Sequence, residues 1–197
     1  LVWHDCSIGF SSQTYSIGNR MKTPPTVSDG IVVATAGEGS VAAVELKNAR
    51  ALWRIKLLDG VVAAPAISDG TVYIAGKDQY LRAIDLYSGR PRWKFLTTSA
   101  LVDTPYLLSD ALYQRIPGVG LTAFDANSAN FTGTKRWTAE QVGGVVLTTA
   151  TNGRLLCWDS EKRILQEVDP KYGSITSTLD LPTVRELLVD TPLQGNL

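Results

Sequence analysis

A period of about 40 residues runs through the chain and constrains its fold more than any other feature. Three kinds of residue keep this spacing: Pro25, Pro65 and Pro105; Glu45, Asp85 and Asp125; and Trp53 and Trp93. Proline, acidic residues and tryptophan serve different structural purposes, so their common period indicates a repeated structural unit.

Each unit has the pattern of short β-strands. Residues 31–34 and 72–75 are apolar, largely β-branched runs, as in strands buried on both faces. Residues 53–57 alternate apolar with basic side chains, which is typical of a strand with one exposed face. Asp-Gly pairs at 29–30 and 69–70 predict tight hairpin turns. We therefore expect four-stranded antiparallel meanders, which at this period are the blades of an all-β propeller.

The repeats predict a single, partial propeller domain over residues 1–197. Four blades are expected at about residues 23–58, 63–97, 103–140 and 145–182. Residues 1–22 should hold the end of a preceding blade with an insertion, and residues 190–197 the start of a following one. Because the first three residues read like the middle of a strand, we expect the chain to be part of a longer protein.

Basic residues mark the outer edge of the blades. They gather in the expected fourth strands: Arg54, Lys56, Arg92, Lys94, Lys135 and Arg136. Proteins protect an unpaired sheet edge from other chains with such charges, so the fourth strand is predicted to lie on the rim. The alternative is a basic binding groove.

Residues 83–93 resemble the tryptophan-docking motif of the pyrroloquinoline-quinone-like repeat family, in which Ala, Asp, Gly and Trp stand at fixed intervals. The first and third units keep most of the motif, whereas the fourth has lost its tryptophan. The residues assigned to docking are Trp3, Trp53, Trp93, Trp137, Asp85, Gly89, Asp125, Asp169 and Gly173. The resemblance implies a ring of seven or eight blades, of which this chain would supply about half.

The motif has a physical rationale. A tight turn after Asp lets the next strand reverse, and the indole four residues beyond Gly then projects into the seam between blades. There it can bury on the order of 200 Å² and donate its N–H to a backbone carbonyl.

Composition and motifs argue against several functions. Lys plus Arg and Asp plus Glu each number 19, so no net charge attracts nucleic acid or an anionic membrane. No apolar run reaches the roughly 18 residues of a membrane span. Cys6 and Cys157 have no metal-ligand spacing, and the single histidine, His4, has no partner suited to catalysis. Enzymes of the resembled family use quinone and calcium, but none of their ligand residues can be transferred to this sequence. We therefore predict no catalytic, cofactor or metal site.

A protein partner is expected at one face of the propeller. The turns between second and third strands vary among units, at residues 37–39, 77–79 and 117–120, and variable loops on a rigid scaffold commonly carry binding sites. The candidate contact residues are Phe10, Tyr15, Ile17, Leu101 and Val102. The alternatives are a loop folded over the channel for the first three residues and blade packing for the other two.

The resulting hypothesis is a non-catalytic scaffold, similar to the propeller lipoproteins of bacterial outer-membrane assembly complexes. The resemblance also implies an extracytoplasmic location, which is periplasmic, outer-membrane-associated or extracellular. Two alternatives remain, namely a ligand-sensing propeller of a larger receptor or protein kinase and a fragment of a quinone-dependent dehydrogenase.

Overall fold

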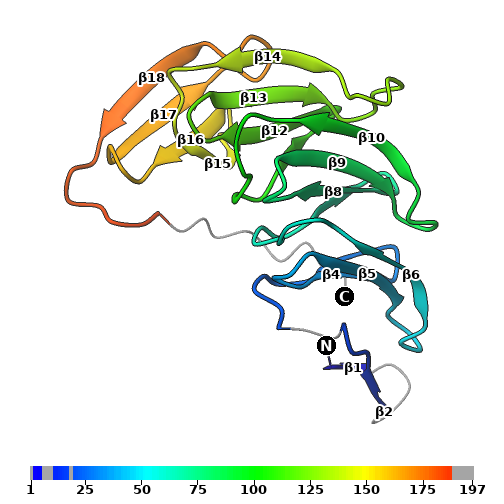
Figure 1. Cartoon of the computed structure of the whole chain (residues 1–197). Helices are drawn as coiled ribbons and strands as arrows, with labels where there is room; N and C mark the ends of the chain where they lie inside the picture. Colours follow the sequence, from blue (N-terminus) through cyan, green and yellow to red (C-terminus); the bar gives the residue numbers. More distant parts are fainter. Residues whose placement is uncertain (1, 6–10, 18–19, 188–197) are drawn as a thin grey trace.

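A computed structural model describes residues 2–5, 11–17 and 20–187. Within these residues every regular element is a β-strand, and the strands form four four-stranded antiparallel sheets and one two-stranded sheet. The four large sheets follow one another along an arc (Figure 1). The predicted all-β, partial-propeller fold is confirmed.

The sheets use the strands in the order of the chain. The first contains β3 (Thr26–Ser28), β4 (Ile31–Thr35), β5 (Ser40–Glu45) and β6 (Ala51–Lys56). The second contains β7 (Ala66–Ser68), β8 (Thr71–Ala75), β9 (Tyr80–Asp85) and β10 (Pro91–Leu96). The third contains β11 (Tyr106–Leu108), β12 (Ala111–Ile116), β13 (Gly120–Asp125) and β14 (Lys135–Ala139). The fourth contains β15 (Val145–Thr149), β16 (Leu155–Asp159), β17 (Ile164–Val168) and β18 (Ile175–Asp180).

The first strand of each large sheet lies on the inner side of the arc, and the fourth strand lies on the outside (Figure 1). A separate hairpin of β1 (Val2–Asp5) and β2 (Ser11–Thr14) precedes these sheets.

Tight turns join the first two strands of each of the first two sheets. Asp29 and Gly30 have φ angles of 50° and 68°, and Asp69 and Gly70 have 47° and 66°. Positive φ at both central residues matches the right-handed twist of a two-residue hairpin. The Asp-Gly pairs therefore explain why the apolar runs that follow them turn back as paired strands.

A β-bulge interrupts the pairing of third and fourth strands at the same point in all four sheets. The residue pairs beside it are Trp53 with Ala43, Trp93 with Ala83, Trp137 with Ala123, and Ser177 with Glu167. A bulge re-aims the side chains next to it. Three sheets thus present an indole opposite a small alanine, whereas the fourth presents a serine opposite a glutamate.

Apolar side chains fill the seams between neighbouring sheets. The first seam contains Val41 and Ile74, the second Leu81 and Phe124, and the third Leu121 and Leu155. Trp93 stacks on Phe124 across the second seam, with ring centroids 6.4 Å apart. The core is therefore a series of layers, each buried only when two sheets meet.

An indole of one sheet bonds to the backbone of the next in all three seams. The Nε1 atoms of Trp53, Trp93 and Trp137 donate to the carbonyl oxygens of Leu86, Ala126 and Pro170 over 2.7, 3.1 and 3.2 Å, respectively. Each acceptor directly follows the acidic residue of the next unit and lies 33 residues after its donor. The repeated spacing thus reflects the same contact made three times.

A glycine of the next sheet lies against the indole in each seam. A Cβ atom on Gly89 would come within 2.6 Å of Trp53 Cγ, and one on Gly173 within 2.6 Å of Trp137 Cε3. Contacts this short require the ring or the turn to move, so the side chain of the turn residue is limited to a hydrogen atom.

The glycine contact can be separated from the strain of the backbone by two substitutions. Gly89 has a φ of 69° and Gly30 a φ of 68°, but a Cβ on Gly30 would meet nothing within 4 Å. Gly30→Ala is expected to lower the free energy of unfolding by about 1–2 kcal/mol through backbone strain alone. Gly89→Ala adds the collision with Trp53, so its total loss should be about 3 kcal/mol or more. Urea unfolding measures both free energies. Equal losses would show that Gly89 is not needed to leave room for the Trp53 ring.

Candidate functional site

The acidic residues of the docking motif hold the turns that carry the acceptor carbonyls. Asp85 Oδ1 accepts the amide of Ser88 at 2.9 Å, Asp125 Oδ1 that of Asn127 at 3.1 Å, and Asp169 Oδ1 that of Lys171 at 2.8 Å. These carboxylates fix the backbone whose carbonyl receives the preceding indole. Their geometry is that of turn residues.

Arginines at the bulges reinforce two of these turns. Arg92 donates to Asp85 Oδ2 at 2.7 Å, and Arg136 binds Asp110 and Asp125 at 2.7 and 3.4 Å. The Arg92 guanidinium lowers the pKa of Asp85 to about 2, against a smaller opposing effect of burial. At neutral pH the carboxylate therefore remains ionised and keeps the turn closed.

Two tyrosines that were not predicted share the docking carbonyls. Tyr73 Oη donates to the Ala126 carbonyl at 3.1 Å, and Tyr113 Oη donates to the Pro170 carbonyl at 3.0 Å. Each carbonyl oxygen thus accepts from an indole and a phenol, which uses both of its lone pairs. The available signal was the 40-residue interval between the tyrosines. In the first sheet Val33 pairs with Ala43 at this position, so no phenol contributes to the first seam.

A third glycine was also not predicted. A Cβ on Gly133 would lie 3.1 Å from Trp93 Cε3, so Gly133 covers that indole as Gly89 covers Trp53. The insertion after Asp125 hides the correspondence, because Gly133 follows Asp125 by eight residues and Gly89 follows Asp85 by four. The interval of four residues from Gly133 to Trp137 would have revealed it, since Gly89 and Trp93 keep the same interval.

The variable turns are tied by backbone hydrogen bonds to the links between sheets. The amide of Lys77 donates to the Gly60 carbonyl at 3.0 Å, and that of Leu101 donates to the Gly76 carbonyl at 3.1 Å. The hydroxyl of Ser99 reaches the Pro117 carbonyl at 2.8 Å. Because neighbouring turns and links hold one another, this face is preorganised, which reduces the entropy lost on binding.

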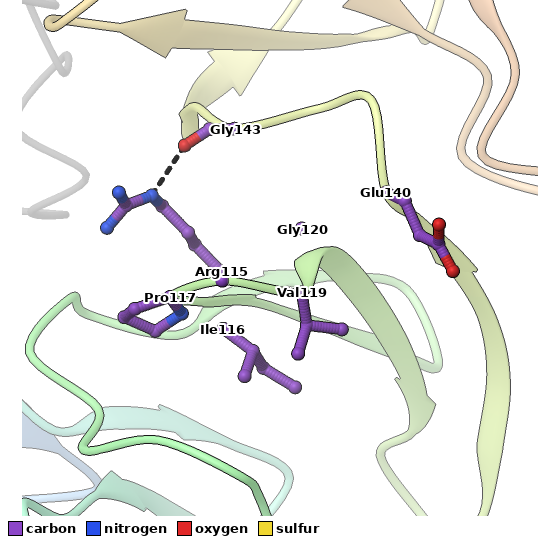
Figure 2. Close-up of a pocket in the computed structure, with 8 residues that line it drawn as sticks. Arg115, Ile116, Pro117, Val119, Gly120, Glu140 and Gly143 are labelled. Carbon is purple, nitrogen blue, oxygen red and sulfur yellow. Dashed lines mark hydrogen bonds between the residues drawn. The ribbon is translucent and has the colours of Figure 1, made fainter.

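A pocket opens on this face where the third and fourth sheets meet (Figure 2). It has a volume of about 560 Å³ and is lined by Arg115, Ile116, Pro117, Gly118, Val119, Gly120, Glu140 and Gly143. Six of these residues come from the end of β12, the turn that follows it and the first residue of β13, and the last two belong to the link to β15. The pocket thus combines apolar side chains with one cation and one anion.

Arg115 connects the parts of the pocket. Its Nε donates to the Gly143 carbonyl (Figure 2), and its Nη1 lies 3.1 Å from Asp103 Oδ2. One side chain therefore joins the β12–β13 turn to the links on both of its sides. A buried or half-buried ion pair of this kind holds a binding surface in one geometry.

Two of the expected contact residues are buried. Ile17 is buried with Ala34 and Ala42, and Leu101 has no exposed surface and packs in the second seam. An apolar loop residue that faces the core reads in sequence like one that faces a partner. Both positions belong to the structural alternative.

The other candidate contact residues differ in how far their side chains are exposed. Tyr15 is half-buried and packs on the same cluster as Ile17, so its truncation should disturb packing as well as any contact. Val102 is 43% exposed and precedes Asp103, the ion-pair partner of Arg115. Phe10 lies outside the described residues, and so does the Trp3 side chain, although the Trp3 backbone pairs with Gln13.

Metal-binding and membrane-spanning features were sought in the described ranges 2–5, 11–17 and 20–187. No cluster there of three or more His, Cys, Asp or Glu residues could hold a metal ion. No helix in that part of the chain is long and apolar enough to cross a membrane. Burial raises the pKa of the Cys157 thiol to about 12, so this side chain stays protonated and packs as an apolar group.

Comparison with known proteins identifies the repeat. Residues 1–130 match the family model of the outer membrane protein assembly factor BamB. The crystal structure of BamB from Moraxella catarrhalis superimposes with a TM-score of 0.71 at 17% identity, over 88% of this chain and 54% of that chain.

Two computationally designed proteins share the fold. Ika8 gives a TM-score of 0.67 at 14% identity, over 79% of this chain and 48% of its own. Ika4 gives 0.58 at 13% identity, over 83% of this chain and 92% of its own. This chain therefore spans about half the length of the BamB and Ika8 structures. No curated protein sequence matches it.

The phenol at the third seam makes a prediction about alkaline pH. Burial raises the pKa of Tyr113 from 10.0 to about 12. Below pH 10 both states hold the proton, and the bond to Pro170 contributes fully. Between pH 10 and 12 the unfolded state releases the proton first, so stability falls as pH rises. Tyr113→Phe should lower the free energy of unfolding by about 1 kcal/mol at pH 7 and show a shallower decline above pH 10. Denaturant unfolding along this pH range measures it, and parallel curves for the two proteins would contradict the burial of the phenol.

Proposed function

The chain belongs to the family of the outer membrane protein assembly factor BamB, and on this basis we propose that it is a non-catalytic scaffold that binds other proteins. Its binding surface is the face that carries the variable turns at residues 37–39, 77–79 and 117–120, which we call the variable face. This surface is centred on the pocket between the third and fourth sheets. Its place of action is extracytoplasmic, at the inner side of an outer membrane, where it acts as an adaptor in protein assembly. The docking residues Trp53, Trp93 and Trp137 serve to keep this face rigid.

The observation that carries the proposal is the preorganised pocket itself. Its turn and links are joined through Arg115 and backbone bonds, so little order is lost when a partner binds. Ile116, Pro117 and Val119 offer apolar surface beside the charges of Arg115 and Glu140. Protein interfaces combine an apolar centre with a polar rim in this way.

The choice of a protein partner follows from the shape of the face. The pocket belongs to a surface of turns and links that runs from sheet to sheet, and the exposed Val102 directly precedes Asp103, the ion-pair partner of the pocket residue Arg115. A small ligand would use the hollow alone, whereas a protein can contact the hollow and the neighbouring turns together.

Site-specific photocrosslinking in cells tests the proposal on the full-length protein. A benzophenone amino acid at Val102 or Glu140 is expected to crosslink to a discrete protein partner. The same group at Phe131 or Tyr87 provides the control, because both side chains are exposed in connections between third and fourth strands, away from the turns and links that form the pocket. Crosslinks of equal yield from the two pairs of positions, or from the control positions alone, would contradict the assignment.

A substitution then tests the contribution of the apolar surface. Val102→Asp places a charge in the contact and should reduce the crosslink yield at Glu140 roughly tenfold, because desolvating an unpaired charge at an interface is costly. Phe131→Asp is the matched control, since it adds the same charge at a position that is 53% exposed and lies in the connection between β13 and β14. Thermal unfolding should show the same midpoint for both variants. A yield that falls equally in both would sink the proposed surface.

A further inference from the structure

The outer strands of the first three sheets are protected by positive charge. Each carries two exposed basic residues: Arg54 and Lys56 in β6, Arg92 and Lys94 in β10, and Lys135 and Arg136 in β14. Lysine and arginine at an unpaired edge oppose the approach of another strand, because the long charged side chains must stay hydrated. These three edges are closed to further pairing.

Hydrogen bonds to residues outside their own sheets protect two of these edges further. The insertion of the third unit crosses β10, where the amide of Lys94 donates to the Phe131 carbonyl at 2.9 Å. Arg54 in β6 donates to the Ile17 carbonyl at 2.7 Å. Both strands therefore have neighbours beyond their own sheet.

The fourth outer strand lacks this protection. β18 runs from Ile175 to Asp180 with the sequence Ile-Thr-Ser-Thr-Leu-Asp, which contains neither lysine nor arginine. It has five exposed residues out of six, and it is the last strand of its sheet. Within the part of the chain that the structure describes, the backbone of β18 bonds only to β17.

The composition of β18 also favours pairing. Thr and Ile are among the residues most compatible with a β-strand, and no proline or charge interrupts them before Asp180. The strand has the features of an edge that accepts another chain.

Two exposed apolar side chains flank this edge. Leu179, near the end of β18, is 54% exposed, and Tyr172, in the turn that leads into the strand, is 68% exposed. Alternate side chains of an added strand would pass over such groups and bury them. Main-chain bonds would then supply affinity, and the apolar contacts at the two ends would set the register.

We propose that the outer edge of β18 is a second interaction site, at which an extended segment of a partner protein adds a fifth strand to the fourth sheet. The segment alternates hydroxyl and apolar residues and carries a cation near Asp180, the one charge of the strand. The site lies on the rim of the arc and is separate from the variable face (Figure 1).

A second copy of this chain is the less suitable occupant. Two β18 strands would join only six residues from each copy, whereas a stable protein interface uses roughly 20–30 residues a side. A partner segment can extend past the strand and make further contacts, so six paired residues can serve it as an anchor.

Peptide binding to the full chain tests the site. The probe is a fluorescein-labelled peptide of eight residues that alternates threonine with isoleucine, leucine and valine and has a lysine at each end. Fluorescence anisotropy should show saturable binding. Hydrogen exchange of the amides in residues 175–180 should slow when the peptide is bound.

Charge on the edge should abolish this binding. Thr176→Lys together with Thr178→Lys gives β18 the protection of the other rim strands and should weaken the peptide roughly tenfold or more. Thr98→Lys together with Thr151→Lys adds the same charge at two exposed threonines outside β18 and should change the affinity less than about twofold. Circular dichroism and thermal unfolding check that both double variants fold as the parent does.

Three results would overturn the proposal. One is equal peptide affinity in the parent and the β18 double variant, and another is protection that falls outside residues 175–180. The third concerns the occupant. A concentration-dependent dimer in sedimentation velocity that the β18 lysines abolish would show that a second copy takes the edge.

Discussion

The bond from an indole nitrogen to a carbonyl of the next sheet is the interaction on which the arc depends. Trp53, Trp93 and Trp137 make it in turn, and each donor reaches the residue that follows the acidic position of the next unit. The surrounding features serve this contact. The bulge aims the indole, the aspartate holds the turn that offers the carbonyl, and a glycine leaves room for the ring. Because each seam uses parts from both sheets, no sheet buries its core alone.

The same contact determines where binding surfaces can form. Fixed seams hold the turns and links of the variable face at constant positions, and Arg115 joins them across the third seam. The rim, in contrast, is shaped by what each outer strand carries. Arginine and lysine side chains oppose the pairing of another strand with β6, β10 and β14, whereas β18 is rich in hydroxyl side chains and contains no such cation. The scaffold is therefore uniform in its seams and variable in its surfaces.

The fold class could be predicted from the sequence because docking requires particular residues at particular intervals. A change in the intervals between the indole, the acidic turn residue and the Asp-Gly hairpin would break a contact. The spacing of these residues in the sequence therefore predicts the architecture. The fourth unit is informative for the same reason. Ser177 and Glu167 stand where the other sheets have tryptophan and alanine, so the fourth strand of this sheet has no indole at the docking position.

The surface was less predictable, because its geometry depends on contacts that do not repeat. Arg115 and Asp103 have no equivalent charged residues in the preceding unit, where Ala75 and Ala63 stand 40 residues earlier, so the spacing of the repeats did not predict the pocket. The direction of a loop side chain was equally hidden. Ile17 and Val102 are both apolar residues in loops, yet one is buried and the other is exposed. Only the packing around them distinguishes the two.

Hydrogen exchange of the indole N–H groups, followed by NMR, tests the central contact most directly. The account predicts that the Nε1 protons of Trp53 and Trp93 exchange only when a seam opens, with protection close to that of the backbone amides in β4 and β8. Exchange at the rate of free indole, while those amides stay protected, would show that the sheets are held together without the tryptophan bonds.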